Sequence, residues 1–420
     1  MSEPSLDDAS VRETLLQKFA YLCSDYTYQR YGNRDLTKMT RVEIIESNTA
    51  EEIDLLRALP KLEMVLVQNI DSEENLNGIF IGISVLKNMK SLFITRCNSL
   101  KSMDEIRKLV QVKRLEIISC PSLFSITHID DLIGLEQLRI TSCLSLVSIA
   151  DIGELRELKK LEITKCDRIT SIADIGDLPK LMKLEITNCD SFTSIGAIGD
   201  LPQLEKLEVR NCDSLISISI ERAKIPKLCT LIINSCECLQ SLGVEIGYLF
   251  ELHTLQISSC NSLVSVDPGQ LTKLKTLEIF NCPSLESITN IGNIRQLQTL
   301  RFLECDSLVS VEALAPKSLR EMLPSCVINV YGKISKDLRE AYNTRGCDFP
   351  YGHIVCKRYE MNPYFDSLRN CPIGIIKVQM LVGKALQRAA GVVYFPGGAQ
   401  SQHLKRSWEE LQQDNDDDEV

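Results

Sequence analysis

Ten cysteines recur along the chain at intervals of 22 to 24 residues, and this period restricts the fold more than any other feature. They are Cys97, Cys120, Cys143, Cys166, Cys189, Cys212, Cys236, Cys260, Cys282 and Cys305. A fixed period in this range is typical of solenoids, in which each repeat buries its apolar side against its neighbours. The period therefore overrides the roughly three separate domains that a length of 420 residues would suggest.

The residues around each cysteine form one motif. It reads L-x-x-L-x-I-x-x-C-x-S-L-x-S-I-x-x-I-G-x-L-x-x and is clearest from Leu158 to Lys180. In an extended strand, alternation of the L-x-I segment buries Leu161 and Ile163 and turns Lys160 and Glu162 to solvent. Each period thus predicts one short strand with a buried side and an exposed side.

Two degenerate copies precede the first of these cysteines, around Val42-Glu43-Ile44 and Val65-Leu66-Val67. They extend the array to about twelve coils between Met39 and Pro316. These repeats resemble the leucine-rich repeat family over about two thirds of the chain. With Cys where many members have Asn, they are similar to the irregular repeats of plant disease-resistance receptors and to intracellular repeat proteins of single-celled eukaryotes.

The resemblance implies an α/β solenoid, a leucine-rich repeat horseshoe with one short parallel strand per coil. The strands would form a concave sheet, and turns or short 3₁₀ segments would form the convex face. The segment 1–38, which precedes the array, holds no G-x-x-x-x-G-K-[ST] phosphate-binding motif. The nucleotide chemistry and immune function of the plant receptors are therefore not expected here.

Both ends of the array require a cap because the terminal coils would otherwise expose apolar surface. Four segments are expected: a helical N-terminal cap at 1–38, the solenoid at 39–326, a mixed C-terminal cap or small α+β extension at 327–400, and a charged helix with a disordered acidic tail at 401–420. The first cap contains an amphipathic helix at 5–23, in which Ser10 and Glu13 have the spacing of a capping box. Residues 325–332 predict one last strand.

The repeated cysteines are interpreted as packing residues. A buried thiol is a small hydrophobe whose S–H can serve a turn carbonyl. Disulfides are not expected, because an in-register stack points the Cβ vectors side by side, and ten free thiols require a reducing compartment. Metal or redox chemistry is the alternative. The serines five positions after each cysteine, from Ser102 to Ser310, are expected to bond turn backbone.

The composition of the chain excludes several classes of function. A net charge of −10 argues against nucleic acid or an anionic membrane as the principal partner. No apolar run approaches the ~18 residues of a membrane span, and the start MSEPSLDDAS does not read as a signal peptide. We therefore expect a cytoplasmic protein without membrane insertion. Four histidines leave little general-base chemistry, so neither catalysis nor a cofactor is expected.

One group of residues near the C-terminus leaves an alternative open. The spacing of Cys347, His353, Cys356 and Cys371 fits no paired zinc-ligand pattern well. If they bound zinc, residues 327–420 would form a zinc-dependent ligase-type or catalytic module, with the repeats as its substrate reader.

The outward positions of the predicted strands form the candidate binding face for a partner protein. Its residues are Phe93, Arg114, Arg139, Lys160, Glu162, Lys183, Glu185, Lys206, Glu208, Ile232, Phe280 and Leu303. Phe93 and the pair Phe280 and Leu303 are the expected anchors, because clustered exposed apolar groups mark contacts. The alternative for the Lys and Glu stripes is a solvated surface of mutually neutralising pairs. The sequence thus predicts a monomeric, non-enzymatic scaffold that docks another protein on its concave face.

Overall fold

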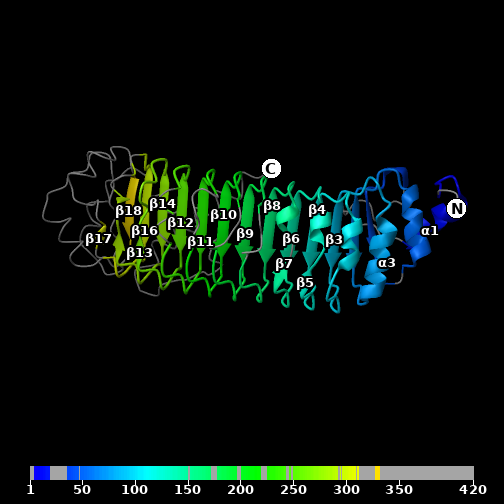
Figure 1. Cartoon of the computed structure of the whole chain (residues 1–420), viewed down its shortest axis with the longest axis horizontal. Helices are drawn as coiled ribbons and strands as arrows, with labels where there is room; N and C mark the ends of the chain where they lie inside the picture. The colour runs from blue at the N-terminus through cyan, green and yellow to red at the C-terminus, as the bar shows by residue number, and fades with distance from the viewer. Residues whose placement is uncertain are drawn as a thin grey trace, which may run out of the picture. The chain divides into compact units, whose positions relative to one another are not determined.

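The repeats form one long parallel sheet in the computed structural model of this protein (Figure 1). The structure describes residues 4–18, 36–46, 48–149, 152–171, 177–195, 200–218, 225–242, 246, 249–291, 294 and 296–308, and the backbone of 310–311 and 327–331. Contacts divide the chain into two units, Met1–Tyr359 and Glu360–Val420, and every described residue belongs to the first.

The main sheet has thirteen strands in chain order along the stack. They are β1 (Arg41–Ile44), β2 (Met64–Gln68), β3 (Ser91–Thr95), β4 (Arg114–Ile118), β6 (Gln137–Thr141), β8 (Lys160–Thr164), β9 (Lys183–Thr187), β10 (Lys206–Arg210), β11 (Thr230–Asn234), β12 (Thr254–Ser258), β14 (Thr276–Phe280), β16 (Thr299–Leu303) and β18 (Val327–Tyr331). All neighbours are parallel and in repeat register, so that Lys160 pairs with Lys183 and Lys183 with Lys206. The expected α/β solenoid is confirmed, and the last strand expected at 325–332 is β18.

Alternation along each strand builds the core as the motif predicts. The second and fourth residues point inward, and Leu161 and Ile163 are at most 1% exposed. Leucines and isoleucines of the turns close the same core from the opposite side, as Leu155 and Leu158 do with no exposed surface. Each coil therefore buries its apolar side mainly against the coils before and after it, which is the solenoid arrangement.

The ten repeated cysteines are buried and free. Each Sγ lies 3.4–3.7 Å from the backbone carbonyl oxygen two residues earlier, to which its S–H donates. Burial raises the pKa of Cys143 and of Cys189 to about 11, so these two groups are thiols at neutral pH. The packing interpretation is confirmed, and the S–H does donate to a backbone carbonyl, but that carbonyl belongs to the last residue of the preceding strand rather than to the turn.

The residue before each of these cysteines turns the chain out of the sheet. All ten have a positive φ of 49–58°, including Lys165, Asn188 and Glu304. Residues other than Gly and Asn adopt this left-handed backbone conformation at a cost in free energy. The turned amide of Lys165 donates to the carbonyl oxygen of Thr187 on the next coil at 2.9 Å, and Asn188 repeats the bond to Arg210 at 2.8 Å. The left-handed residue thus links adjacent coils.

We expect Cys166→Ser to lower the free energy of unfolding by about 1 kcal/mol, with Cys166→Ala or Cys166→Thr losing the same or less. The Sγ of Cys166 lies 3.5 Å from the Thr164 carbonyl, a distance that suits sulfur and is too long for a hydroxyl. The serine would leave its buried O–H poorly paired. Thermal unfolding under reducing conditions measures the effect.

Alkylation of the native protein tests the burial itself. Among the described cysteines, exposed Cys238 should react first, whereas peptides that carry the ten buried cysteines should react slowly. Rapid labelling of most of these ten would contradict the assignment.

The opposite side of the core differs between the N-terminal coils and the later ones. In the first coils it carries two α-helices, α2 (Ala50–Asp54) and α3 (Glu73–Ile83), together with 3₁₀ segments, whereas the described coils after α3 carry 3₁₀ segments without an α-helix. The 3₁₀ segments are η2 (Leu36–Lys38), η3 (Leu55–Ala58), η4 (Asp104–Lys108), η5 (Ile129–Asp131) and η6 (Ile152–Glu154). The expectation of turns and 3₁₀ segments alone is wrong for these first coils. Thr49 caps α2 through a capping box with Glu52, and Ser72 caps α3 through the amide of Asn75.

Short strands form a second, narrower ladder beside these segments. It contains β5 (Ser125–Ile126) with β7 (Ser148–Ile149), and β13 (Ser265–Val266) with β15 (Ser287–Ile288) and β17 (Ser310–Val311). Parallel bridges continue the ladder from Ser171 through Ser194 and Ser217 to Ser241. The expected side-chain bonds to turn backbone are not found among the described serines of this column. Ser102 instead bonds the carboxylate of Glu73, with Oγ and Oε1 3.3 Å apart.

The first helix, α1, covers Ala9–Lys18 within the predicted range 5–23. Its first turn is capped by Asp8 rather than by Ser10, because the Asp8 carboxylate accepts from the Ser10 amide at 2.8 Å. Leu15 is buried against the first coils, and Val11 and Leu16 pack there partly exposed. Residues 19–23 of the predicted helix and the elements expected beyond 331 lie outside the described residues. No helix in the described part of the chain has the length and apolar content to cross a membrane.

Candidate functional site: the outer face of the main sheet

The sheet face is the solvent side of the main sheet, formed by the first, third and fifth residues of its strands. Strand register places one column of side chains beside the next, as Arg114, Gln137 and Lys160 show for the first position. The third position carries Glu116, Arg139 and then Glu162 on the same three strands. The structure therefore brings together the charged candidates that the sequence places one repeat apart.

The carboxylates of this face are less exposed than the sequence pattern suggests. Glu116, Glu162 and Glu208 are only 4%, 7% and 5% exposed. Each stands in the central column of the face, where long cationic side chains of its own and neighbouring strands lie against it. The expectation that Glu162 turns to solvent is wrong, because alternation fixes which side of the sheet a residue faces but not what covers it there.

Ten side chains join into one sheet-face network. Its members are Arg114, Glu116, Arg139, Lys160, Glu162, Lys183, Glu185, Lys206, Glu208 and Arg210. Glu162 is paired with three cations: Arg139 at 2.6 Å, Lys160 at 2.6 Å and Lys183 at 3.4 Å. Lys183 in turn reaches Glu185 at 2.6 Å and Glu208 at 3.7 Å. The network crosses five adjacent strands from β4 to β10.

Arg210 belongs to this network although it was not among the sequence candidates. Its Nη2 lies 2.9 Å from Oε1 of Glu208, two residues earlier on β10. The signal was present in the alternation, since the fifth residue of a strand faces the same side as the first and third. Most strands carry Thr, Ile, Asn or Ser at this position, so the fifth position as a whole does not indicate a charged column.

The electrostatics of the network follow from its geometry. The surrounding cations lower the pKa of Glu162 to about 2, against the opposing effect of burial, and they also lower the pKa of Glu208. Six cations face four carboxylates. Counted over the side chains alone, the cationic residues are 29–42% exposed and the acidic residues 6–24%, so solvent meets mainly positive charge.

A shallow depression, open to solvent, lies within the network. It is lined by Arg114, Leu115, Glu116, Gln137, Leu138, Arg139, Lys160 and Glu162. A hollow of this kind offers charged contacts rather than an enclosed apolar pocket, and it contains no arrangement of nucleophile and base. The face is therefore suited to binding a surface rather than to enclosing a small molecule.

The predicted apolar anchors differ in their surroundings. Phe93 is half-buried, and the Arg114 guanidinium carbon lies 5.5 Å from its ring centroid as a cation–π contact. Ile232 lies on this face between Glu208 and Gln256 but is only 9% exposed, so the expectation that it is an exposed apolar group is wrong. Phe280 and Leu303 are half-buried on neighbouring strands.

Replacing Phe280 and Leu303 together by alanine should weaken capture of a partner at least tenfold and lower the melting temperature only slightly. Both side chains are half-buried, so their removal costs less packing than loss of a core residue. Quantitative pull-down and thermal unfolding measure the two effects. The double change Ile216→Ala with Val264→Ala, which removes side chains 50% and 44% exposed elsewhere, is the matched control. A fall of many degrees would show instead that Phe280 and Leu303 are packed under the C-terminal segment.

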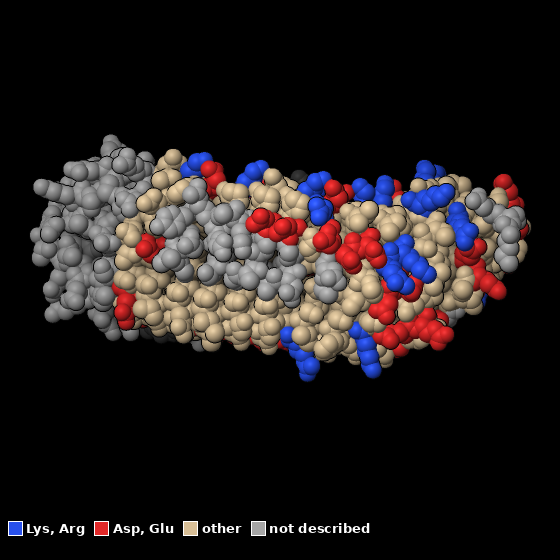
Figure 2. All heavy atoms as spheres, viewed as in Figure 1, with Lys and Arg blue, Asp and Glu red and all other residues tan. Residues whose placement is uncertain are grey.

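A second exposed surface was not singled out by the sequence. Four positions after the repeated cysteines, Phe124, Val147, Ile216 and Val264 are 37–55% exposed. The Val147 amide donates to the Phe124 carbonyl oxygen at 3.0 Å, so this column follows the second ladder. Figure 2, which views the helical side of the molecule, shows Lys, Arg, Asp and Glu gathered over the N-terminal coils at the right and rows of uncharged side chains over the middle coils.

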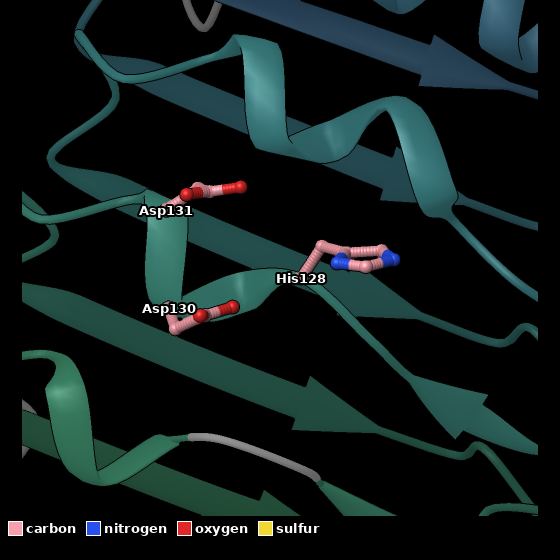
Figure 3. A group of neighbouring side chains, drawn as sticks. All are labelled: His128, Asp130 and Asp131. Carbon is pink, nitrogen blue, oxygen red and sulfur yellow. The ribbon is translucent and has the colours of Figure 1, made fainter.

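One group of possible metal ligands occurs among the described residues. His128, Asp130 and Asp131 lie on the turn at η5, with one ligand atom of each within 4.8 Å of the others (Figure 3). His128 and Asp131 are exposed, and all three come from the same turn, so this is a polar turn rather than a built metal site. Cys347, His353, Cys356 and Cys371, the sequence candidates for zinc, lie outside the described residues.

Comparison with known proteins adds little beyond the fold. No protein-family model and no curated protein matches this sequence. Among solved structures, the leucine-rich repeat domain of the type III effector XopL is 20% identical, with a TM-score of 0.37, over 69% of this chain and 76% of that one. The internalin InlF of Listeria monocytogenes is 14% identical, with a TM-score of 0.39, over 73% of this chain and 95% of that one. A leucine-rich repeat protein of Leptospira interrogans is 16% identical, with a TM-score of 0.26, over 73% of this chain and 98% of that one.

These similarities are too low to carry an argument about partners or activity. The fold rests instead on the chain itself, on its 22–24-residue period and the parallel sheet with one short strand per period. Together these two observations show that the protein is a leucine-rich repeat solenoid.

Proposed function

We propose that this protein is a non-enzymatic scaffold that binds another protein on the sheet face, the concave face of the sequence prediction. The observation that carries the proposal is the sheet-face network. Ten charged side chains from five adjacent strands form a continuous surface. An extended surface of this kind is what solenoids use to hold partners.

The electrostatic arrangement supports a binding role over a purely structural one. The nearly buried carboxylates of the network can stabilise the fold, but ion pairs of exposed side chains contribute only ~0–1 kcal/mol each. Stabilisation of the fold therefore does not explain why the cations are about a third exposed. Charge patterns at interfaces steer association and fix register. The ten buried free thiols fit a reducing compartment, and we therefore place the scaffold in the cytoplasm.

Site-specific photo-crosslinking in the native cell tests the proposal. A photoreactive residue at Gln137, which is exposed on the sheet face, should yield a defined crosslinked protein. The same residue at Phe124, which is 55% exposed on the second ladder, should not. Crosslinks from Phe124 with none from Gln137 would show that the partner binds the other surface.

A further inference from the structure

We propose that the partner presents an acidic, extended segment of about six residues, which lies across β4 to β10 on the sheet-face network. This inference rests on the proposed function and specifies the chemistry of the partner. It is carried by three observations: the excess of cations in the network, their exposure above the carboxylates, and the length of the row that they form.

The excess charge is local and opposite to that of the whole chain. The network contains six cations and four carboxylates, whereas the full sequence carries a net charge of −10. The carboxylates of Glu116, Glu162 and Glu208 are almost covered, so a partner would meet Lys160, Lys183 and neighbouring cations first. A partner carboxylate placed there would gain contacts to cations without having to displace the buried carboxylates.

The row has the length of a short extended segment. From β4 to β10 the sheet has four strand spacings, which at ~4.8 Å each give about 19 Å. An extended chain advances ~3.3 Å per residue, so about six residues span the row. The first-position lysines of β8, β9 and β10 then stand at successive spacings of ~4.8 Å beneath it.

An acidic protein segment fits this row better than a nucleic acid. Two excess positive charges replace few of the counterions that a phosphate backbone carries, and the chain as a whole repels a long polyanion. Single-stranded nucleic acids also use aromatic platforms for stacking. The network contains no aromatic residue, and Phe93 beside it is already in contact with Arg114.

The test uses the full chain and fluorescence anisotropy at low salt with labelled hexaglutamate, and hexaglutamine carrying the same label as the blank. The triple change Lys160→Gln, Lys183→Gln and Lys206→Gln should weaken hexaglutamate binding at least tenfold. The matched control is Lys113→Gln, Lys159→Gln and Lys180→Gln, which removes three lysines paired with Glu136 and Glu157 in the turns before the strands. This control should change binding less than twofold.

Glu185→Gln provides a second test, in which the expected result is a gain rather than a loss of hexaglutamate affinity. Glu185 is the most exposed carboxylate of the network at 24%, and its neutralisation adds one unit of net positive charge to the row. It should tighten hexaglutamate binding severalfold. Thermal unfolding of every variant identifies any that fails to fold, and the Glu185 result then decides the question.

Three outcomes would overturn the inference. One is a failure of hexaglutamate to bind above the hexaglutamine blank, and another is equal or tighter binding of a hexathymidine oligonucleotide. The third is a tenfold gain in hexaglutamate affinity on removal of residues 414–420, which would identify the acidic tail Asp414–Glu419 of this chain as the occupant. The crosslinking at Gln137 can succeed in any of these cases, so failure of this inference is distinguishable from failure of the proposed function.

Discussion

A chain that ends at residue 326 is expected to aggregate, whereas removal of residues 414–420 should leave the melting temperature unchanged. The shorter chain lacks β18, which pairs with β16 in the register Leu300 with Ile328 and Phe302 with Val330. Leu300 and Phe302 are at most 1% exposed in the described structure. Loss of the last strand leaves β16 as an unpaired edge over an apolar core, and such edges associate.

Size-exclusion chromatography with light scattering measures this effect. A chain that ends at residue 359 keeps β18 and the whole first unit, and it is the matched control for the loss of the second unit. It should remain more soluble than the chain that ends at 326. If the chain that ends at 326 is soluble and monomeric instead, the segment beyond it is an independent domain rather than a cap.

Glu162→Gln is expected to lower the free energy of unfolding by about 2 kcal/mol. The substitution keeps the shape of the side chain but leaves Arg139, Lys160 and Lys183 around an uncharged group. The fall of the Glu162 pKa from 4.5 to about 2 corresponds to about 3 kcal/mol of stabilisation of the charged carboxylate in the folded state. Solvent screening of the partly exposed cations reduces this value. Denaturant unfolding at pH 7 measures the loss.

The lowered pKa of Glu162 also predicts that the stability of the protein depends on pH. Because the folded-state pKa of Glu162 lies below its ordinary value, its contribution is complete above about pH 4.5 and is lost as the pH falls toward 2. The difference in stability between the wild type and Glu162→Gln should therefore shrink across this window. Glu157→Gln is the control, because Glu157 is 44% exposed and pairs only with Lys180 among the described residues. A Glu162 variant as stable as the control would mean that the network contributes nothing to the fold.

The repeat itself determined most of the fold. The period of the cysteines and the L-x-I alternation predicted the parallel strands, their register and the buried cysteines, and the β-rich segment 325–332 predicted the final strand β18. These features follow from local rules, since alternation decides which side chains face the core and a fixed period stacks equivalent residues. The left-handed residue before each cysteine was not predicted, although asparagine at Asn188 and Asn211 is a residue type that tolerates it.

Only the tertiary structure decided what covers each outward residue. The sequence assigned Glu162 and Ile232 to the exposed side, and they do face it, yet neighbouring strands leave them 7% and 9% exposed. It also could not show that Asp8, not Ser10, caps α1. The exposure and the ion pairs of an outward residue depend on the side chains of the adjacent strands, which lie one repeat away in the sequence. The pattern along one strand therefore gives a residue its side of the sheet, and the adjacent coils determine its contacts and its charge environment.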